Sequence, residues 1–274
     1  MTARIFAFIL GLLVDPAMPA HPAPRETVVV LHGLNRTHRS MAKLANSLKA
    51  DGYEVINCAY PSRAADIDTL AEDLFATLTP RIQTAPKVHF VTHSLGGLLL
   101  RSHLQRHPLS NLGRVVMLAP PNRGSEVAER LRGWRLYRWL NGPSGSQLGI
   151  GRDSYPRALA PPAFDLGVIA GDRSVNPLLS LLIPGPDDGK VSVERAKAPG
   201  MRDFLRLHVT HTFMMRNRHV IRQTRHFLLH GRFSACEERV GPQRPNPGPP
   251  PPRSRGARTP GARRQNWTHA AESV

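Results

Sequence analysis

Cysteine is scarce in this chain of 274 residues, which contains only Cys58 and Cys236. Cys58 lies in the apolar run VINCAY, whereas Cys236 lies in a polar segment near the carboxyl terminus. Two isolated cysteines exclude a framework of several disulfides and also a C-x-x-C redox or metal site. A single Cys58–Cys236 bridge needs an oxidising compartment, and no feature of the sequence favours it.

Acidic residues are also few. The chain has 20 Asp and Glu residues against 37 Lys and Arg residues, which gives a formal net charge of +17. An excess of this size is typical of proteins that bind nucleic acid or an anionic membrane surface. The basic residues, however, are spread along the chain and form no single stripe. We therefore expect no nucleic-acid binding and retain membrane-surface association as an alternative.

Long apolar runs are missing as well. The most extended one, from Ile5 to Val14, is too short to span a bilayer comfortably. Arg4 precedes this run, and it is followed by the small residues Ala17, Ala20 and Ala23. This layout is typical of a signal peptide. We predict that residues 1–23 form a signal peptide or an uncleaved anchor of a periplasmic or secreted bacterial protein, the alternative being a first buried strand or helix.

The carboxyl-terminal segment, residues 235–274, contains almost no apolar residues. It includes the proline run Pro249–Pro252 and scattered arginines. Such a segment buries too little apolar surface to offset the entropy lost on ordering, so we predict a disordered tail. Residues 24–234 are then left as one domain.

Within this domain, short apolar runs alternate with segments of helical periodicity. Runs rich in β-branched and apolar residues predict strands at Thr27–Gly33, Tyr53–Tyr60, Val88–Thr92, Arg114–Ala119, Leu166–Gly171 and Phe204–Val209. Apolar positions three and four residues apart predict helices at 37–50, 67–82, 95–107, 125–132 and 213–229, with Ser125 as a helix cap.

The alternation of strands and helices indicates the fold class. Strands that are apolar throughout and separated by helices indicate a parallel sheet covered on both faces. Right-handed crossovers then give a three-layer α/β/α sandwich. Ligands of such sheets bind beyond the carboxyl ends of the strands, and Ser94 lies at such an end.

The stretch VTHSLGG, residues 91–97, places Ser94 between a predicted strand and a predicted helix. A turn this tight needs small neighbours, which Gly96 and Gly97 provide. The pattern is that of a nucleophile elbow, G-x-S-x-G, with Thr92 in place of the first glycine. Ser94 is therefore the candidate nucleophile.

The first predicted strand ends in His32-Gly33-Leu34, where an oxyanion hole is expected. Its donors should be the backbone amides of Leu34 and of Leu95, the residue after the nucleophile. We expect His32 to brace this loop and not to transfer protons.

A serine nucleophile needs a base, and a histidine late in the chain is the expected candidate. His211 follows the last predicted strand and precedes the last predicted helix, so it should lie in a loop at the edge of the sheet where Ser94 lies. We expect His208 to be packed within that strand. His226 and His230 have a spacing that metal ligands on a helix can have, but no glutamate accompanies them, and we predict no metal site.

The acid that orients the base should lie between Ser94 and His211. Asp188, in the turn PDDGKV, fits this role, and Asp172, directly after the strand LGVIAG, is the alternative acid. Asp153 and Asp165 are interpreted as loop charges.

Taken together, these pieces resemble one known family. The motifs VVVLHGL, THSLGG, APPNRGS, GVIAG, DDGKVSVE and HTFMMRN occur in the order found in the bacterial lipase/esterase branch of the α/β-hydrolase superfamily. The resemblance extends from about Thr27 to Phe233. It implies a serine hydrolase of carboxylic esters, lipid or short-chain acyl esters, that uses Ser94, Asp188 and His211 and needs no cofactor.

Few residues precede the first predicted strand, so we expect a minimal form of this fold, with about six mostly parallel strands and a short lid. Residues 132–162 are the only material that the sequence offers for a lid. Their aromatic residues either fill the core or line an acyl pocket: Trp134, Tyr137, Trp139 and Tyr155.

Two alternatives remain open at this point. The same residues would serve an acyltransferase or a lipid-remodelling deacylase, which differ from a hydrolase only in the acceptor. A non-catalytic envelope-binding protein is the alternative outside the enzymes, but it would be expected to lack one of the three candidate residues, and none is missing.

Overall fold

The computed structural model describes residues 25–235 apart from residue 153. The predicted signal peptide or anchor at residues 1–23 lies outside the described residues. The predicted tail from residue 236 onward, including Cys236, and Asp153 also lie outside them. Cys58 is buried.

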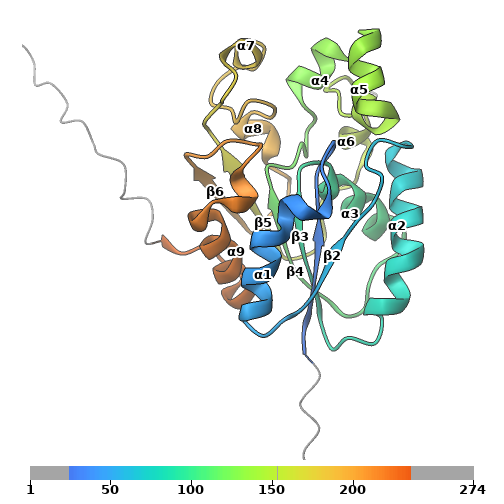
Figure 1. Ribbon diagram of the computed structural model, residues 1–274, viewed down its shortest axis with the longest axis vertical. Helices are drawn as coiled ribbons and strands as arrows, with labels where there is room; N and C mark the ends of the chain where they lie inside the picture. The colour runs from blue at the N-terminus through green and yellow to red at the C-terminus, as the bar shows by residue number, and fades with distance from the viewer. Residues whose placement is uncertain (1–24, 153, 236–274) are drawn as a thin grey trace, which may run out of the picture. The chain divides into compact units, whose positions relative to one another are not determined.

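The described residues contain one open sheet of six strands in the order β2-β1-β3-β4-β5-β6, and every pair of neighbours is parallel (Figure 1). The strands are β1 (Thr27–Leu31), β2 (Glu54–Cys58), β3 (Val88–His93), β4 (Leu112–Leu118), β5 (Leu166–Gly171) and β6 (Asp203–Leu207). The predicted three-layer fold with about six parallel strands is confirmed.

Helices connect the strands. The longer ones are α1 (Ala42–Ala50), α2 (Ile67–Ile82), α3 (Leu95–Arg106), α5 (Arg135–Ser146) and α9 (Arg218–His230). The shorter ones are η1 (His38–Met41), α4 (Glu126–Leu131), α6 (Tyr155–Ala158), α7 (Pro177–Ser180), α8 (Val193–Ala196) and η2 (Met214–Arg216). None of the helices in the described part of the chain is both long and apolar enough to cross a membrane.

The core has two halves because successive strand residues point to opposite faces. Val29 and Leu31 pack with α2 and α3, whereas Val28 and Val30 pack with α1 and α9. Figure 1 shows α1 and α9 covering one face, with α2 and α3 on the other. Both faces are apolar, which is why the strands read as continuous apolar runs.

The structure corrects two predictions near the end of the domain. β6 ends at Leu207, so His208 lies beyond the strand, and its side chain is 75% exposed, not packed. The closing helix begins at Arg218, not at residue 213, because the side chain of Asn217 accepts the backbone N–H groups of His219 and Val220. Residues 213–217 instead contain the short helix η2 and the capping residue Asn217.

The segment predicted as a lid begins beyond the carboxyl ends of the strands, where α4, α5 and α7 lie (Figure 1, top). Near its middle this segment is fixed to the domain: Ser144 donates its backbone N–H to the Ala65 carbonyl and its hydroxyl to the Ser62 carbonyl. In its first half, Trp134 and Trp139 are exposed. These two tryptophans are therefore not core residues.

Candidate active site

Ser94 lies between the last residue of β3 and the first residue of α3. Its backbone has φ 51° and ψ −120°, a strained conformation for a residue with a side chain. Gly96 makes the turn possible, because a Cβ at this position would lie 2.8 Å from the His32 carbonyl oxygen. The turn is thus tight enough to project the Ser94 side chain away from the sheet.

Thr92 stands where a glycine is usual in the elbow pattern, and the structure shows how it is accommodated. Its side chain is fully buried, and a Cβ on Gly97 would lie 3.2 Å from the Thr92 hydroxyl. The missing side chain at Gly97 therefore leaves space for the one at Thr92. This pairing preserves the close approach of helix and strand.

Ser94, His211 and Asp188 come together at the carboxyl edge of the sheet. The His211 Nε2 atom lies 3.1 Å from the Ser94 hydroxyl oxygen, and the His211 Nδ1 atom lies 2.8 Å from a carboxylate oxygen of Asp188. A proton on Nδ1 donated to Asp188 leaves Nε2 free to accept the Ser94 proton. His211 and Asp188 are almost completely buried.

Asp188 is held in place by its own turn. Its second carboxylate oxygen accepts the backbone N–H groups of Lys190 and Val191, at 3.0 and 2.9 Å. Its carbonyl also accepts the His211 backbone N–H. The carboxylate, the turn and the histidine loop are therefore one rigid unit.

Asp172, the alternative acid, is placed elsewhere. It forms an ion pair with Arg206 and lies 2.9 Å from Nδ1 of the exposed His208. The structure thus brings Asp188, and not Asp172, to His211.

The two predicted oxyanion donors are free to act. Within the described residues, neither the Leu34 nor the Leu95 backbone N–H donates a hydrogen bond. Leu95 is the first residue of α3, where an amide has no partner within the helix. The loop that carries Leu34 is braced by His32, whose ring stacks on Tyr60 at 4.1 Å between centroids and whose Nδ1 atom donates to the Gly33 carbonyl.

His93 is a buried neighbour of the site that the sequence analysis did not single out. Its Nε2 atom donates to the His211 carbonyl at 3.0 Å, and the two rings lie 4.9 Å apart. Burial, and then the charge of His211, hold the pKa of His93 well below its usual value, so the ring is neutral. Its position directly before Ser94 at the end of a buried strand is the signal that could have identified it.

A cavity of about 200 Å³ opens beside Ser94 and His211. The apolar part of its lining comes largely from residues 121–148: Pro121, Val127, Ala128, Leu131, Tyr137 and Leu148. Leu179, close to the end of α7, also lines it. A residue outside the segment predicted as a lid, residues 132–162, therefore also contributes to the lining of this cavity.

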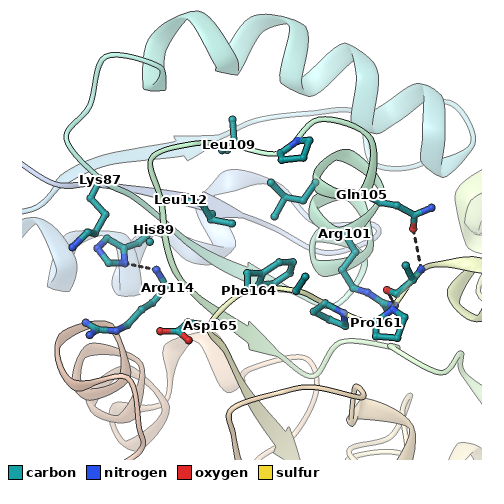
Figure 2. A pocket seen from close by; sticks show the side chains of 16 residues that line it. Lys87, His89, Arg101, Gln105, Leu109, Leu112, Arg114, Pro161, Phe164 and Asp165 are labelled. Atoms are coloured by element: carbon teal, nitrogen blue, oxygen red, sulfur yellow. Dashed lines mark hydrogen bonds between the residues drawn. The ribbon is translucent and has the colours of Figure 1, made fainter.

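A larger hollow of about 680 Å³ lies at the opposite edge of the sheet, near the starts of β3, β4 and β5 (Figure 2). No candidate site residue lines it. Its charged groups have protein partners: Lys87 pairs with Glu26, Asp165 pairs with Arg202, and the His89 Nδ1 atom accepts the backbone N–H of Arg114. We assign no chemistry to it.

No group of three or more His, Cys, Asp or Glu side chains within the described residues could hold a metal ion. His226 and His230, the histidine pair noted in the sequence, lie with their rings 4.4 Å apart.

Comparison with known proteins places this geometry in context. Residues 28–231 match the sequence model described as the alpha/beta hydrolase family. No curated protein matches the sequence at a significant level.

Solved structures share the fold. The mature Bacillus licheniformis lipase BlEst2 is 22% identical, with a TM-score of 0.55 over 73% of this chain and 90% of that chain. Its propeptide form is 21% identical, with a TM-score of 0.57 over 72% of this chain and 48% of that chain. The metagenomic carboxyl esterase MGS0156 is 18% identical, with a TM-score of 0.54 over 73% of this chain and 70% of that chain. At these identities the likeness is one of fold.

Proposed function

Because the chain belongs to the alpha/beta hydrolase family, we propose that it cleaves carboxylic esters, with Ser94 as nucleophile, His211 as base and Asp188 as the orienting acid. The observation that carries this proposal is the hydrogen-bonded chain from Ser94 through His211 to Asp188, at 3.1 and 2.8 Å. Such a chain, on a strained strand-to-helix turn, is the arrangement that activates a serine hydroxyl.

In the first half of the proposed reaction, the Ser94 oxygen attacks the ester carbonyl carbon while Nε2 of His211 takes the hydroxyl proton. The carbonyl oxygen becomes an oxyanion, which accepts hydrogen bonds from the Leu34 and Leu95 amides. Asp188 stabilises the imidazolium that forms on His211. As the tetrahedral intermediate collapses, the ester C–O bond breaks, and the alcohol leaves with the proton from His211.

In the second half, water attacks the acyl-serine carbonyl and gives a proton to His211. Collapse of this second intermediate releases the carboxylic acid, and the proton returns to the Ser94 oxygen. These steps require only the groups named and water, in line with the prediction that no cofactor takes part.

The alternatives from the sequence differ in testable ways. An acyltransferase or lipid-remodelling deacylase would use the same three residues, and added alcohol would then divert product from acid to a new ester. A non-catalytic envelope-binding protein would have no need of the strained Ser94 or of the buried pair His211–Asp188.

The experiment that tests the proposal is hydrolysis of p-nitrophenyl butyrate by the full chain and by Ser94→Ala. Loss of the nucleophile should lower kcat by about 10⁶ with little change in melting temperature. A Ser94→Ala variant that turns over at a comparable rate would refute the assignment.

We also propose that residues 132–140, which include the first half of α5, contact a lipid surface. Trp134 is 64% exposed and Trp139 is 75% exposed, and arginines lie between and beside them at Arg132, Arg135 and Arg138. Exposed tryptophan interleaved with positive charge suits the interface of an anionic membrane. Export directed by the predicted signal peptide or anchor would place the protein in the periplasm or outside the cell.

A further inference from the structure

Two positive side chains near Ser94 have no protein partner. Arg36 and Lys190 both line the cavity, and within the described residues neither the Arg36 guanidinium nor the Lys190 ammonium makes a hydrogen bond or an ion pair. By contrast, Arg195 pairs with Glu126 and Arg123 pairs with Glu194. The cavity therefore carries positive charge that the protein does not neutralise.

Each of these side chains starts from a fixed point beside the proposed machinery. Arg36 is two residues after Leu34, and its backbone N–H donates to the Gly33 carbonyl. Lys190 is two residues after Asp188; its N–H donates to the Asp188 carboxylate, and its carbonyl accepts the Ser125 hydroxyl at 2.7 Å. The backbone at both positions is held, whereas the charged ends are free to meet a ligand.

The two charged side chains line the same cavity as Ser94. Desolvation by the surrounding protein and then the Arg36 charge lower the pKa of Lys190, although Lys190 is an exposed residue that lines the cavity. Burial lowers the pKa of His93, the residue before Ser94, and the charges of His211, Lys190 and Arg36 lower it further. Asp188, two residues before Lys190, is already committed to His211 and to its own turn.

Resting on the proposed ester hydrolysis, we propose that the substrate is an ester whose alcohol part carries an anionic group, a phosphate or a carboxylate, bound by Arg36 and Lys190. The apolar residues of the lining, from residues 121–148, bind the acyl chain of the ester. The alcohol part of the ester then lies against Arg36 and Lys190. Arginine matches the geometry of phosphate and carboxylate oxygens with two parallel hydrogen bonds, and lysine adds a point charge.

The test uses two matched pairs of esters with the full chain. 1-Butyrylglycerol 3-phosphate is compared with 1-butyrylglycerol, and O-butyryl glycolate with O-butyryl glycolamide, by following butyrate release. In at least one pair, kcat/KM should be about tenfold or more higher for the anion, and the pair that responds identifies phosphate or carboxylate. The preference should shrink at about 0.5 M NaCl, because salt screens exposed charges.

Variants assign the preference to residues. Arg36→Gln and Lys190→Gln should each lower the anionic-to-neutral ratio of kcat/KM about tenfold, and Arg36→Lys should retain part of it. Arg39→Gln is the matched control: Arg39 is an exposed arginine of the adjacent helix η1 that does not line this cavity, so the variant should leave the ratio unchanged. Melting temperatures verify that each variant is folded.

Three results would overturn the inference. The first is a kcat/KM for the anionic ester that is equal to or lower than that for the neutral ester in both pairs. The second is an equal loss of kcat/KM for both members of a pair in the Arg36 and Lys190 variants, and the third is a change of the anionic-to-neutral ratio in Arg39→Gln as large as in those variants. If p-nitrophenyl butyrate is cleaved and no preference appears, this inference fails alone. If no ester is cleaved, the proposed function fails, and this inference with it.

Discussion

Replacing Asp188 with Asn should nearly abolish turnover while the fold survives. The Asp188 carboxylate lies 2.8 Å from Nδ1 of His211 and accepts a hydrogen bond from its N–H group. An amide NH₂ at that place is a donor, so it favours the tautomer with the proton on Nε2, which cannot take the proton of Ser94. A tautomer error of this kind costs about 10⁴ in kcat, or roughly 5 kcal/mol at about 1.36 kcal/mol per factor of ten.

The same substitution at Asp172 is the matched control. Asp172 pairs with Arg206 and with the exposed His208. Pairs of this kind near the surface contribute about 0–1 kcal/mol to stability, and none of these groups lines the cavity beside Ser94. Asp172→Asn should therefore change kcat less than about twofold.

The assay is kcat for p-nitrophenyl butyrate, measured for both variants beside the wild type, with melting temperature as the control for folding. Asp188→Asn should stay folded because its remaining amide oxygen can still accept the N–H groups of Lys190 and Val191. A crippled Asp172→Asn variant with a fully active Asp188→Asn variant would reverse the choice of acid.

Three further predictions concern the cavity beside Ser94, the exposed Trp139 of α5 and the buried His103. The cavity of about 200 Å³ holds about six or seven groups the size of water, which is enough for a short acyl chain but not for a laurate chain. The value of kcat/KM should therefore be about tenfold higher for p-nitrophenyl butyrate than for p-nitrophenyl laurate. A preference for the laurate would mean that the acyl chain binds elsewhere. Trp139→Ser should lower the ratio of activity on esters in anionic vesicles to activity on soluble esters about tenfold, and an unchanged ratio would remove α5 from the lipid contact. Burial lowers the pKa of His103 to about 4. Between pH 6.5 and 4 the unfolded chain then binds a proton that the folded chain does not, so the free energy of unfolding decreases as the pH is lowered, by up to about 1.4 kcal/mol per pH unit. His103→Phe, which preserves the stack on Phe75, should flatten the pH dependence of the free energy of unfolding measured in urea. An unchanged pH dependence would contradict this.

The sheet could be predicted from the sequence because both of its faces are buried. The central strands β1, β4 and β5 consist mostly of apolar residues. Helix α2 has the predicted bounds, and Asp66 caps its start. The strand-to-helix turn at Ser94 follows from small residues between two apolar runs. Strands, helix ends and this turn depend mainly on residues near one another in the sequence, so local patterns are sufficient to predict them.

The surroundings of the site were harder to predict because they depend on contacts between distant segments. Leu179 lines the cavity, although nothing in its own short apolar stretch indicates a neighbour more than eighty residues away. That Arg36 and Lys190 lack partners is visible only once every nearby acid has been placed. His208 was wrongly predicted to be packed, because the end of β6 depends on its pairing with β5.

The most direct test of the central claim, that Ser94 is an activated nucleophile, is labelling of the full chain with a fluorophosphonate followed by mass spectrometry of the intact protein and its peptides. We predict one adduct per chain, carried by the peptide that contains Ser94, and none on Ser94→Ala. An adduct on a different residue, equal labelling of Ser94→Ala, or a wild-type protein that does not react would contradict the account.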